Sequence, residues 1–148
     1  EVKSYGNGRK PLNDKTVTIF NRSEVIGRPL AVLMSNDGAS VFSFDEHGPL
    51  LFKDGIPEET EYERADALKL SDIVVTGVPN TKFKKISIKE LKKNVICINF
   101  STNQNFDKKV EDFALDFVPR VGPMTVTMCM RNAIRLYENF FHHHASAS

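Results

Sequence analysis

The stretch from Thr16 to Asp45, TVTIFNRSEVIGRPLAVLMSNDGASVFSFD, constrains the fold of this chain more than any other segment. It begins with Thr16–Phe20, a short β-branched and apolar run that is typical of a buried strand. Asn21-Arg22-Ser23 interrupts this run, and Ser23 is a candidate N-cap for a helix. Ser40–Phe44 is a second β-rich run. Between them, apolar residues recur with a helical period, at Ile26, Leu30, Leu33 and Met34.

A strand–helix–strand unit of about 30 residues, with a polar turn before the helix, is typical of a dinucleotide-binding site. The first-turn N–H groups of the helix are free for a phosphate, and the helix dipole favours its negative charge. Of the usual G-x-G-x-x-G pattern, only the third glycine has a counterpart, Gly27. Asn21 stands where the first glycine would be, and asparagine tolerates left-handed dihedrals. On this spacing alone, a parallel α/β domain without a nucleotide is an equal alternative.

Asp45 favours the nucleotide hypothesis. It lies 18 positions after Gly27, at the end of the second strand. An acidic residue there can accept a hydrogen bond from a ribose hydroxyl, whereas the 2′-phosphate of NADP would meet a like charge. We therefore expect an NAD site, the alternative being that Asp45 is a solvated loop carboxylate.

Composition excludes several classes of partner. The chain has 148 residues and a formal net charge of +1, so no strong field attracts nucleic acid or an anionic membrane. No apolar run approaches the ~20 residues of a membrane-spanning helix. Cys97 and Cys129 lie in apolar contexts far apart, which indicates free thiols in a reducing compartment, expected to be the cytoplasm. No metal site is expected.

The chain divides into three parts. Residues 1–14 are predicted to be a linker from a missing N-terminal domain, because they are polar and contain Gly6, Gly8 and Pro11. Residues 15–139 are the predicted dinucleotide-binding domain. Residues 140–148 include three consecutive histidines and are expected to be a disordered or artificial tail. The first residue is Glu1, which suggests a piece of a longer protein.

The segments after Asp45 continue the alternation of strands and helices. A short strand is possible at Leu50–Phe52, and strands are predicted at Asp72–Gly77, Val95–Phe100 and Leu115–Val118. Helices are predicted within Glu58–Leu70, Ser87–Lys93 and Met124–Asn139. The apolar face of the last helix is expected to pack in the core or against another domain. This order predicts an α/β fold, a Rossmann-like doubly wound parallel sheet with helices on both faces.

Right-handed crossovers place the carboxyl ends of all parallel strands at one edge of the sheet. Small and polar residues follow each of these ends. They are Asn21-Arg22-Ser23, Asp45, Thr76-Gly77-Val78-Pro79 and Asn99-Phe100-Ser101. Ligands of open α/β sheets bind at this edge, so the four segments together are stronger evidence for a site than any one motif.

Three segments resemble the methylenetetrahydrofolate dehydrogenase family. They are NRSEVIGRPL (Asn21–Leu30), DIVVTGVP (Asp72–Pro79) and VGPMTV (Val121–Val126). The resemblance extends from about Lys15 to Asn139.

The departures from the family pattern point to one branch of it. Asn21 replaces the glycine of the usual Gly-Arg-Ser turn, and Ile98-Asn99-Phe100 replaces the segment usual in bifunctional members. The Pro-Gly-Gly-Val-Gly-Pro segment of those members is shortened to Pro119–Pro123. Together with Asp45, these features resemble the monofunctional, NAD-dependent fungal type and argue against cyclohydrolase activity.

The resemblance implies that this chain is the Rossmann half of the enzyme. The catalytic Tyr and Lys and most of the folate site would lie in an absent N-terminal half, so no catalytic residue is assigned here. The implied reaction is hydride transfer from methylenetetrahydrofolate to NAD in one-carbon metabolism, by a homodimer. Arg22 and Ser23 would bind the pyrophosphate or adenosine side, Asp45 the adenosine ribose. The full set of expected cofactor-binding residues is Asn21, Arg22, Ser23, Gly27, Asp45, Thr76, Gly77, Val78, Pro79, Phe100 and Thr125.

Two other hypotheses remain open. One is a nucleotide-binding regulatory module without chemistry of its own. The other is a structural domain that mediates dimerisation through its surface strands and the helix Met124–Asn139. An upstream segment that supplied a folate domain would favour the dehydrogenase.

Overall fold

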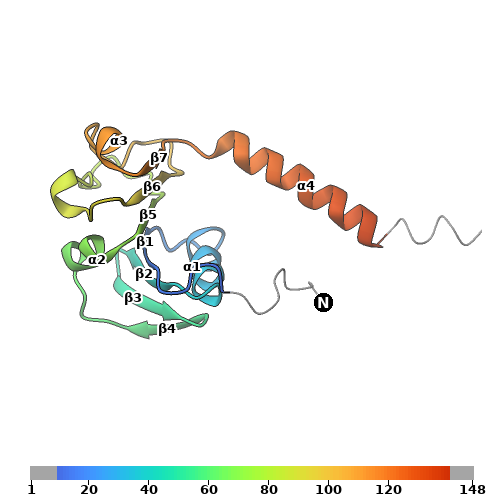
Figure 1. Cartoon of the computed structure of the whole chain (residues 1–148), viewed down its shortest axis with the longest axis horizontal. Helices are drawn as coiled ribbons and strands as arrows, with labels where there is room; N and C mark the ends of the chain where they lie inside the picture. Colours follow the sequence, from blue (N-terminus) through green and yellow to red (C-terminus); the bar gives the residue numbers. More distant parts are fainter. Residues whose placement is uncertain (1–9, 141–148) are drawn as a thin grey trace, which may run out of the picture.

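A seven-stranded sheet forms the centre of the computed structural model, which describes residues 10–140 (Figure 1). The strand order is β4-β3-β2-β1-β5-β6-β7. The strands are β1 (Thr16–Phe20), β2 (Ser40–Asp45), β3 (Gly48–Lys53), β4 (Ile56–Glu59), β5 (Ile73–Thr76), β6 (Ile96–Asn99) and β7 (Asp116–Val118). The helices are α1 (Gly27–Asn36), α2 (Arg64–Leu70), α3 (Val110–Phe113) and α4 (Gly122–Phe140), with a 3-10 turn, η1 (Ile88–Glu90).

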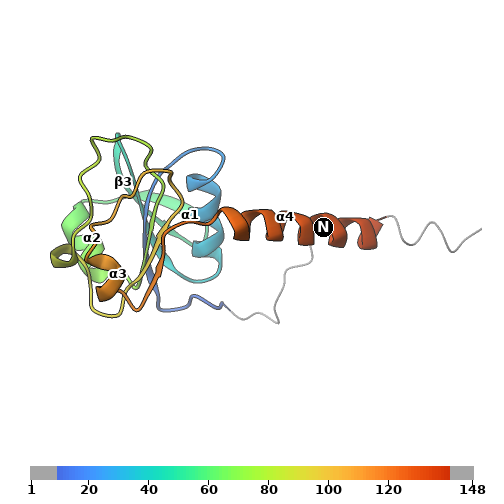
Figure 2. The ribbon, with the colours of Figure 1, turned by 90° about the horizontal axis from the view of Figure 1, so that it is seen from above.

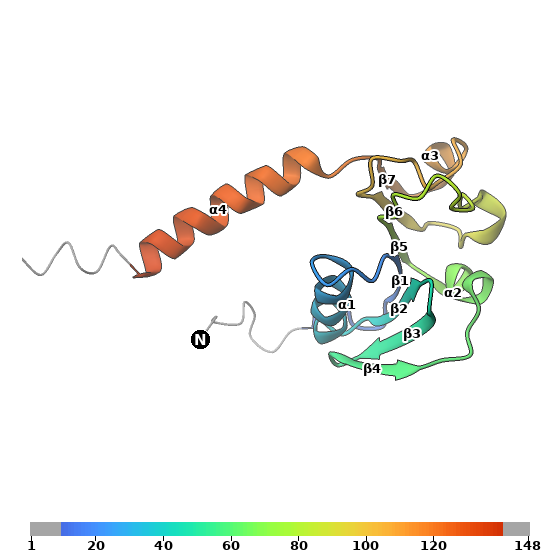
Figure 3. The same cartoon turned by 180° about the vertical axis from the view of Figure 1, so that it is seen from behind.

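The predicted parallel sheet is confirmed for the neighbouring strands β2, β1, β5, β6 and β7, which pair in parallel in this order. β3 and β4 add an antiparallel edge, visible in Figure 3. Two short connections cause it, because two-residue loops can only join antiparallel strands. Asp45 pairs with Gly48, and Lys53 pairs with Ile56 around Asp54-Gly55, where both residues have positive φ.

The helix predicted within Glu58–Leu70 is wrong at its start. Glu58 and Glu59 belong to β4, and α2 begins at Arg64. The Asp54-Gly55 turn determines this outcome, since the following residues continue back along β3 as a hairpin.

One face of the sheet packs against α1, and the alternation of side chains along β1 explains how. Val17 and Ile19 are fully buried on this face, in a cluster with Ala31 of α1, Val41 and Phe52. The predicted inner face of α1 is partly wrong. Ile26 and Leu33 are 45% and 63% exposed, while the buried positions are Gly27, Ala31 and Ser35. Leu30 and Met34 of the predicted set do pack against this cluster, but the small residues are the ones that are fully buried.

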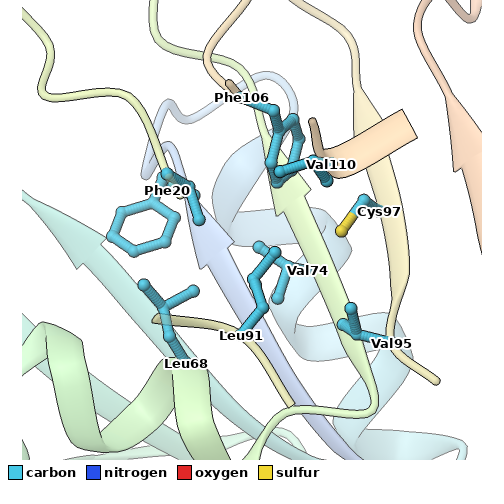
Figure 4. Packing of buried hydrophobic residues seen from close by; sticks show 9 residues of the cluster. Phe20, Leu68, Val74, Leu91, Val95, Cys97, Phe106 and Val110 are labelled. Carbon is cyan, nitrogen blue, oxygen red and sulfur yellow. The ribbon is translucent and has the colours of Figure 1, made fainter. Parts of the chain in front are cut away.

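The opposite face is covered by α2, η1 and α3 (Figure 2). Phe20 from the end of β1 is buried here, in a cluster that includes Leu68 of α2 and Val110 of α3 (Figure 4). The other fully or nearly buried members are Leu68, Val74, Ile86, Leu91, Val95, Cys97, Phe106 and Val110. Two separate apolar clusters on the two faces hold the sheet in place, and they leave the strand tips to the polar segments.

Helix α4 leaves the sheet after β7 and extends away from it (Figures 1 and 2). The predicted helix Met124–Asn139 is confirmed, with observed bounds Gly122–Phe140. None of its residues is buried within the described part of the chain. Its apolar side chains, expected to pack in the core or on another domain, therefore stay exposed here: Val126, Met130, Ile134 and Tyr137 are 56–63% exposed. The predicted linker up to residue 9 and the predicted tail from residue 141 lie outside the described residues.

Candidate nucleotide-binding site

The strand register brings the predicted tip segments together at one edge. Phe20 pairs with Phe44 on one side and with Thr76 on the other, and Thr76 pairs with Asn99. The backbone continues this alignment by one residue, because the N–H of Gly77 donates to Phe20 and that of Phe100 donates to Thr76. The segments that follow β1, β2, β5 and β6 thus start from the same level of the sheet.

The turn after β1 is fixed by the side chain of Asn21. Its amide Nδ2 donates to the carbonyl oxygen of Gly77 at 2.8 Å, and its Oδ1 accepts from the N–H of Ser23 at 2.8 Å. The left-handed dihedral that we expected Asn21 to tolerate is not used. Among the described non-glycine residues, only Asp14, Asp54 and Asn94 have positive φ. Asparagine replaces glycine here for its amide, which ties the tip of β1 to that of β5.

Helix α1 begins at Gly27, later than the N-cap role predicted for Ser23 implies. The hydroxyl of Ser23 still accepts from the N–H groups of Ile26 and Gly27, at 3.2 and 3.3 Å, across the turn that leads into the helix. Ser23, Ile26, Gly27 and Arg28 all use their N–H groups within this turn, whereas those of Glu24 and Val25 have no partner among the described residues. These two N–H groups are available to an anion.

Gly27 allows the start of α1 to lie close against the turn after β1. A Cβ at this position would lie 2.0 Å from the carbonyl oxygen of Asn21 and 2.7 Å from its Oδ1. No side chain fits there, which is the role that the third glycine of a dinucleotide turn performs. The turn therefore lies directly against the start of α1, and the bond from Asn21 to Gly77 holds it there.

Arg22 points away from the turn and into the β2–β3 hairpin. Its Nη2 donates to the carbonyl oxygens of Ser43 and Gly48, its Nε lies 3.4 Å from the hydroxyl of Ser43, and its Nη1 lies 3.0 Å from Oδ1 of Asp45. The side chain is 6% exposed. Burial lowers the pKa of the Arg22 guanidinium and Asp45 opposes that shift, so the group remains charged.

Asp45 lies at the tip of β2, where its two carboxylate oxygens have different surroundings. Oδ1 accepts from the N–H of His47 at 2.7 Å and pairs with Arg22. Oδ2 lies 3.7 Å from Nδ1 of the exposed His47 ring. The side chain of Asp45 is 23% exposed. Oδ2 is therefore the oxygen that a ribose hydroxyl can reach.

The β5 tip offers backbone more than side chains. Thr76 is fully buried, and its hydroxyl donates to Oδ1 of Asn99 at 3.1 Å, so its side chain does not line the groove. The ring of Phe100 lies directly against Gly77. A Cβ on Gly77 would lie 1.9 Å from two ring carbons. Phe100 is half-buried at this point and presents its remaining surface at the sheet edge.

Asn105, which we did not foresee, holds the loop after β5. Its buried amide bonds both backbone groups of Val78, accepting from the N–H and donating to the carbonyl oxygen at 3.0 Å each. Ser101 donates to the same carbonyl, and Asn103 donates to that of Pro79. The polar run Ser101–Asn105, directly after a strand, was the signal that could have revealed this network. It fixes Val78 and Pro79 at the edge.

Thr125 is the predicted residue that the structure separates from the strand tips. It lies on the exposed first turn of α4, where its hydroxyl donates to the carbonyl oxygen of Val121 at 2.9 Å. The described residues contain no group of three or more His, Cys, Asp or Glu side chains that could hold a metal ion. The arrangement offers a dinucleotide two free backbone N–H groups in the turn before α1, a close glycine contact and one carboxylate.

Comparison with known proteins identifies the family of this chain. A family model described as "Tetrahydrofolate dehydrogenase/cyclohydrolase, NAD(P)-binding domain" matches residues 5–141. The methylenetetrahydrofolate dehydrogenase [NAD(+)] of Schizosaccharomyces pombe is 38% identical over 145 residues, which are 92% of this chain and 44% of that protein. The enzyme of the same name from Dictyostelium discoideum is 39% identical over 134 residues, 86% of this chain and 42% of that protein.

A solved structure agrees with these relatives. The NAD-dependent 5,10-methylenetetrahydrofolate dehydrogenase from Saccharomyces cerevisiae superposes with a TM-score of 0.75 at 36% identity. The match covers 86% of this chain and 44% of that one. The chain thus spans less than half the length of the relatives it matches.

Proposed function

Because the chain belongs to the tetrahydrofolate dehydrogenase/cyclohydrolase family, through its NAD(P)-binding domain, we propose that it is the NAD-binding half of a methylenetetrahydrofolate dehydrogenase. The observation that carries this proposal is the tight turn Asn21–Gly27, packed against the start of α1 with two free N–H groups, together with the carboxylate of Asp45. NAD would accept the hydride of 5,10-methylenetetrahydrofolate. The chain itself would position the cofactor for this transfer.

Each tip segment has a separate task in this proposal. The N–H groups of Glu24 and Val25, at the positive end of α1, would bind the pyrophosphate. Oδ2 of Asp45 would accept a hydrogen bond from the adenosine ribose. Val78, Pro79 and Phe100 would form the wall beside the nicotinamide, held by the Asn105 network. A wall that is rigid before binding reduces the entropy cost of ordering the cofactor.

Titration of the purified chain with NADH and with NADPH, followed by calorimetry, tests the cofactor assignment. We expect NADH to bind more tightly than NADPH. An absence of NADH binding, or a preference for NADPH, would contradict the proposal.

The acid–base groups of the reaction are proposed to belong to the folate-binding part of the longer protein. Lys82, Lys84 and Lys85 follow the β5 tip, but they are exposed. We therefore expect this chain alone to be inactive with methylenetetrahydrofolate and NAD. Turnover on the order of 1 per second or faster, a normal enzymatic rate, would contradict this division of labour.

Helix α4 supplies the contact between the two parts in this proposal. Its exposed apolar side chains match the inter-domain packing expected from the sequence, and the relatives are more than twice as long as this chain. A folate-binding domain added in trans should protect α4 amides from hydrogen exchange. Protection confined to other elements would exclude α4 as the contact.

The same helix favours the second candidate, a dimerisation module without chemistry. Association through α4 would bury its apolar face between two copies. Analytical ultracentrifugation tests association through α4. A dimer that Met130→Glu converts to a monomer supports this association. We propose a homodimer for the full enzyme.

No helix of the described residues is long and apolar enough to cross a membrane. A cytoplasmic location is part of the proposal.

A further inference from the structure

We propose that Arg22 is a positioning residue for Asp45, and thereby a determinant of the preference for NAD over NADP. This assignment rests on the proposed NAD site, and it replaces the pyrophosphate-binding role that the family resemblance implied for Arg22. The evidence is the set of contacts that the guanidinium makes inside the β2–β3 hairpin.

The nitrogens of the guanidinium are all engaged within the protein. Nη2 bonds the carbonyl oxygens of Ser43 and Gly48, which lie on the two strands of the hairpin. Nε faces the Ser43 hydroxyl, and Nη1 pairs with Asp45. With 6% of the side chain exposed, a pyrophosphate could reach Arg22 only if these contacts broke. Breaking these bonds and the ion pair costs free energy that the phosphate would have to supply.

The same contacts orient the carboxylate. Oδ1 of Asp45 is held from two sides, by Nη1 of Arg22 at 3.0 Å and by the N–H of His47 at 2.7 Å. Two anchors on one oxygen fix the plane of the carboxylate, and they direct Oδ2 outward. A ribose hydroxyl then meets an acceptor that is already in place.

The arrangement also explains why an arginine beside the site does not attract NADP. A guanidinium is the usual ligand for a 2′-phosphate, since its planar fork matches phosphate oxygens. In this chain Asp45 and the hairpin carbonyls occupy that fork, so the group nearest to the 2′ position is the carboxylate. Arg22 and Asp45 thus act together, and the preference for NAD over NADP depends on both.

The test compares Arg22→Gln and Arg22→Lys with Arg28→Gln, using dissociation constants for NADH and NADPH at fixed salt. Arg28 is the matched control, because it lies in the first turn of α1 but forms an exposed pair with Glu24 at 2.9 Å. For the Arg22 variants we expect NADH to bind at least tenfold more weakly and NADPH to change less than threefold. The ratio of the NADPH and NADH dissociation constants should not change for Arg28→Gln.

Other outcomes separate the competing roles. If both constants rise by the same factor, Arg22 binds the pyrophosphate common to both cofactors, and the positioning role is wrong. If both dissociation constants are unchanged and only the free energy of unfolding falls, Arg22 stabilises the hairpin alone, and the inference is overturned. If the wild-type chain binds neither cofactor, the proposed function fails first, and this assignment fails with it.

A measurement on the unmodified chain covers variants that do not fold. Because Nη1 and Nη2 hold separate acceptors, NMR should show slow rotation of the Arg22 guanidinium in the free and in the NADH-bound chain. The exposed Arg28 guanidinium is the internal reference for fast rotation. Fast rotation of Arg22 in either state would overturn the inference.

Discussion

A single methyl group at Gly27 tests how closely α1 must approach the turn after β1. The ideal Cβ of Gly27→Ala lies 2.0 Å from the carbonyl oxygen of Asn21, 2.5 Å from its carbonyl carbon and 2.7 Å from its Oδ1. Real Cβ contacts essentially never fall below 3.0 Å. The start of α1 must therefore withdraw, and it would strain the bonds from Ile26 and Gly27 to Ser23.

The expected cost follows from two opposing effects. Glycine to alanine in a helix normally stabilises by about 0.5–1 kcal/mol. Overpacking against backbone costs about 1–3 kcal/mol, and the carbonyl of Asn21 cannot rotate away as a side chain would. We expect a net loss of roughly 1–2 kcal/mol in the free energy of unfolding. Binding of NADH by the folded variant should weaken by about tenfold or more, since ~1.4 kcal/mol corresponds to one decade.

Urea denaturation and calorimetry with NADH measure both effects. Gly122→Ala is the matched control, because it also starts a helix and its Cβ would meet nothing within 4 Å. We expect the control to be neutral or slightly stabilising. If Gly27→Ala is as stable as the wild type and binds NADH equally well, the close approach of α1 to the turn is not a requirement of the site.

Three further predictions concern charge and reactivity. Asp45→Ser should narrow the ratio of the NADPH and NADH dissociation constants by about tenfold, because it removes the ribose acceptor and releases Arg22; an unchanged ratio would mean that Asp45 does not contact the ribose. Burial raises the pKa of Glu90, but the N–H of Ser87 and the charge of Arg64 together lower it by more. The net pKa of Glu90 is therefore below its ordinary value of 4.5. The stabilisation from Glu90 is thus present above pH 4.5 and lost as the pH falls below it, so Glu90→Gln should flatten the acid side of the stability profile; an identical acid slope would refute this. Burial raises the pKa of the Cys97 thiol to about 12, so iodoacetamide at pH 8 should label only the exposed Cys129 in the folded chain, and labelling of both thiols would contradict the packing.

The sequence was sufficient to predict the central strands and the last helix, because those segments carry an unambiguous apolar pattern. The possible short strand at Leu50–Phe52 is confirmed as part of β3, but the sequence did not reveal β4 or the antiparallel pairing, although Asp54-Gly55 is a strong hairpin signal. The acidic residues that follow this turn favoured a helix by composition, whereas the turn geometry directs them along β3. The inner face of α1 was misjudged for a similar reason. Periodicity selects the large apolar residues, but a helix this close to the sheet buries its small ones.

At the candidate site, the sequence was enough to place the tip segments at one edge but not to orient their side chains. The motif Asn-Arg-Ser is compatible with an arginine that binds phosphate and with one that holds a carboxylate. The difference depends on Ser43, Asp45 and Gly48, which are distant in sequence. Ser43 and Asp45 meet Arg22 because β2 pairs with β1, and Gly48 meets it because β2 turns back as β3. No local pattern around residue 22 contains that information.

The departure of Asn21 from the glycine usual in this turn has a structural counterpart across the edge. The amide of Asn21 bonds the carbonyl of Gly77, and the ring of Phe100 lies against the same glycine. The tips of β1, β5 and β6 are therefore linked through one residue that has no side chain. Any larger residue at position 77 would displace the ring, and any residue without an amide at position 21 would free the turn. A site held in this way is organised before the cofactor arrives, which lowers the ordering cost of binding. In the proposed nucleotide site, the backbone of Gly77 is then as important as the close contact at Gly27.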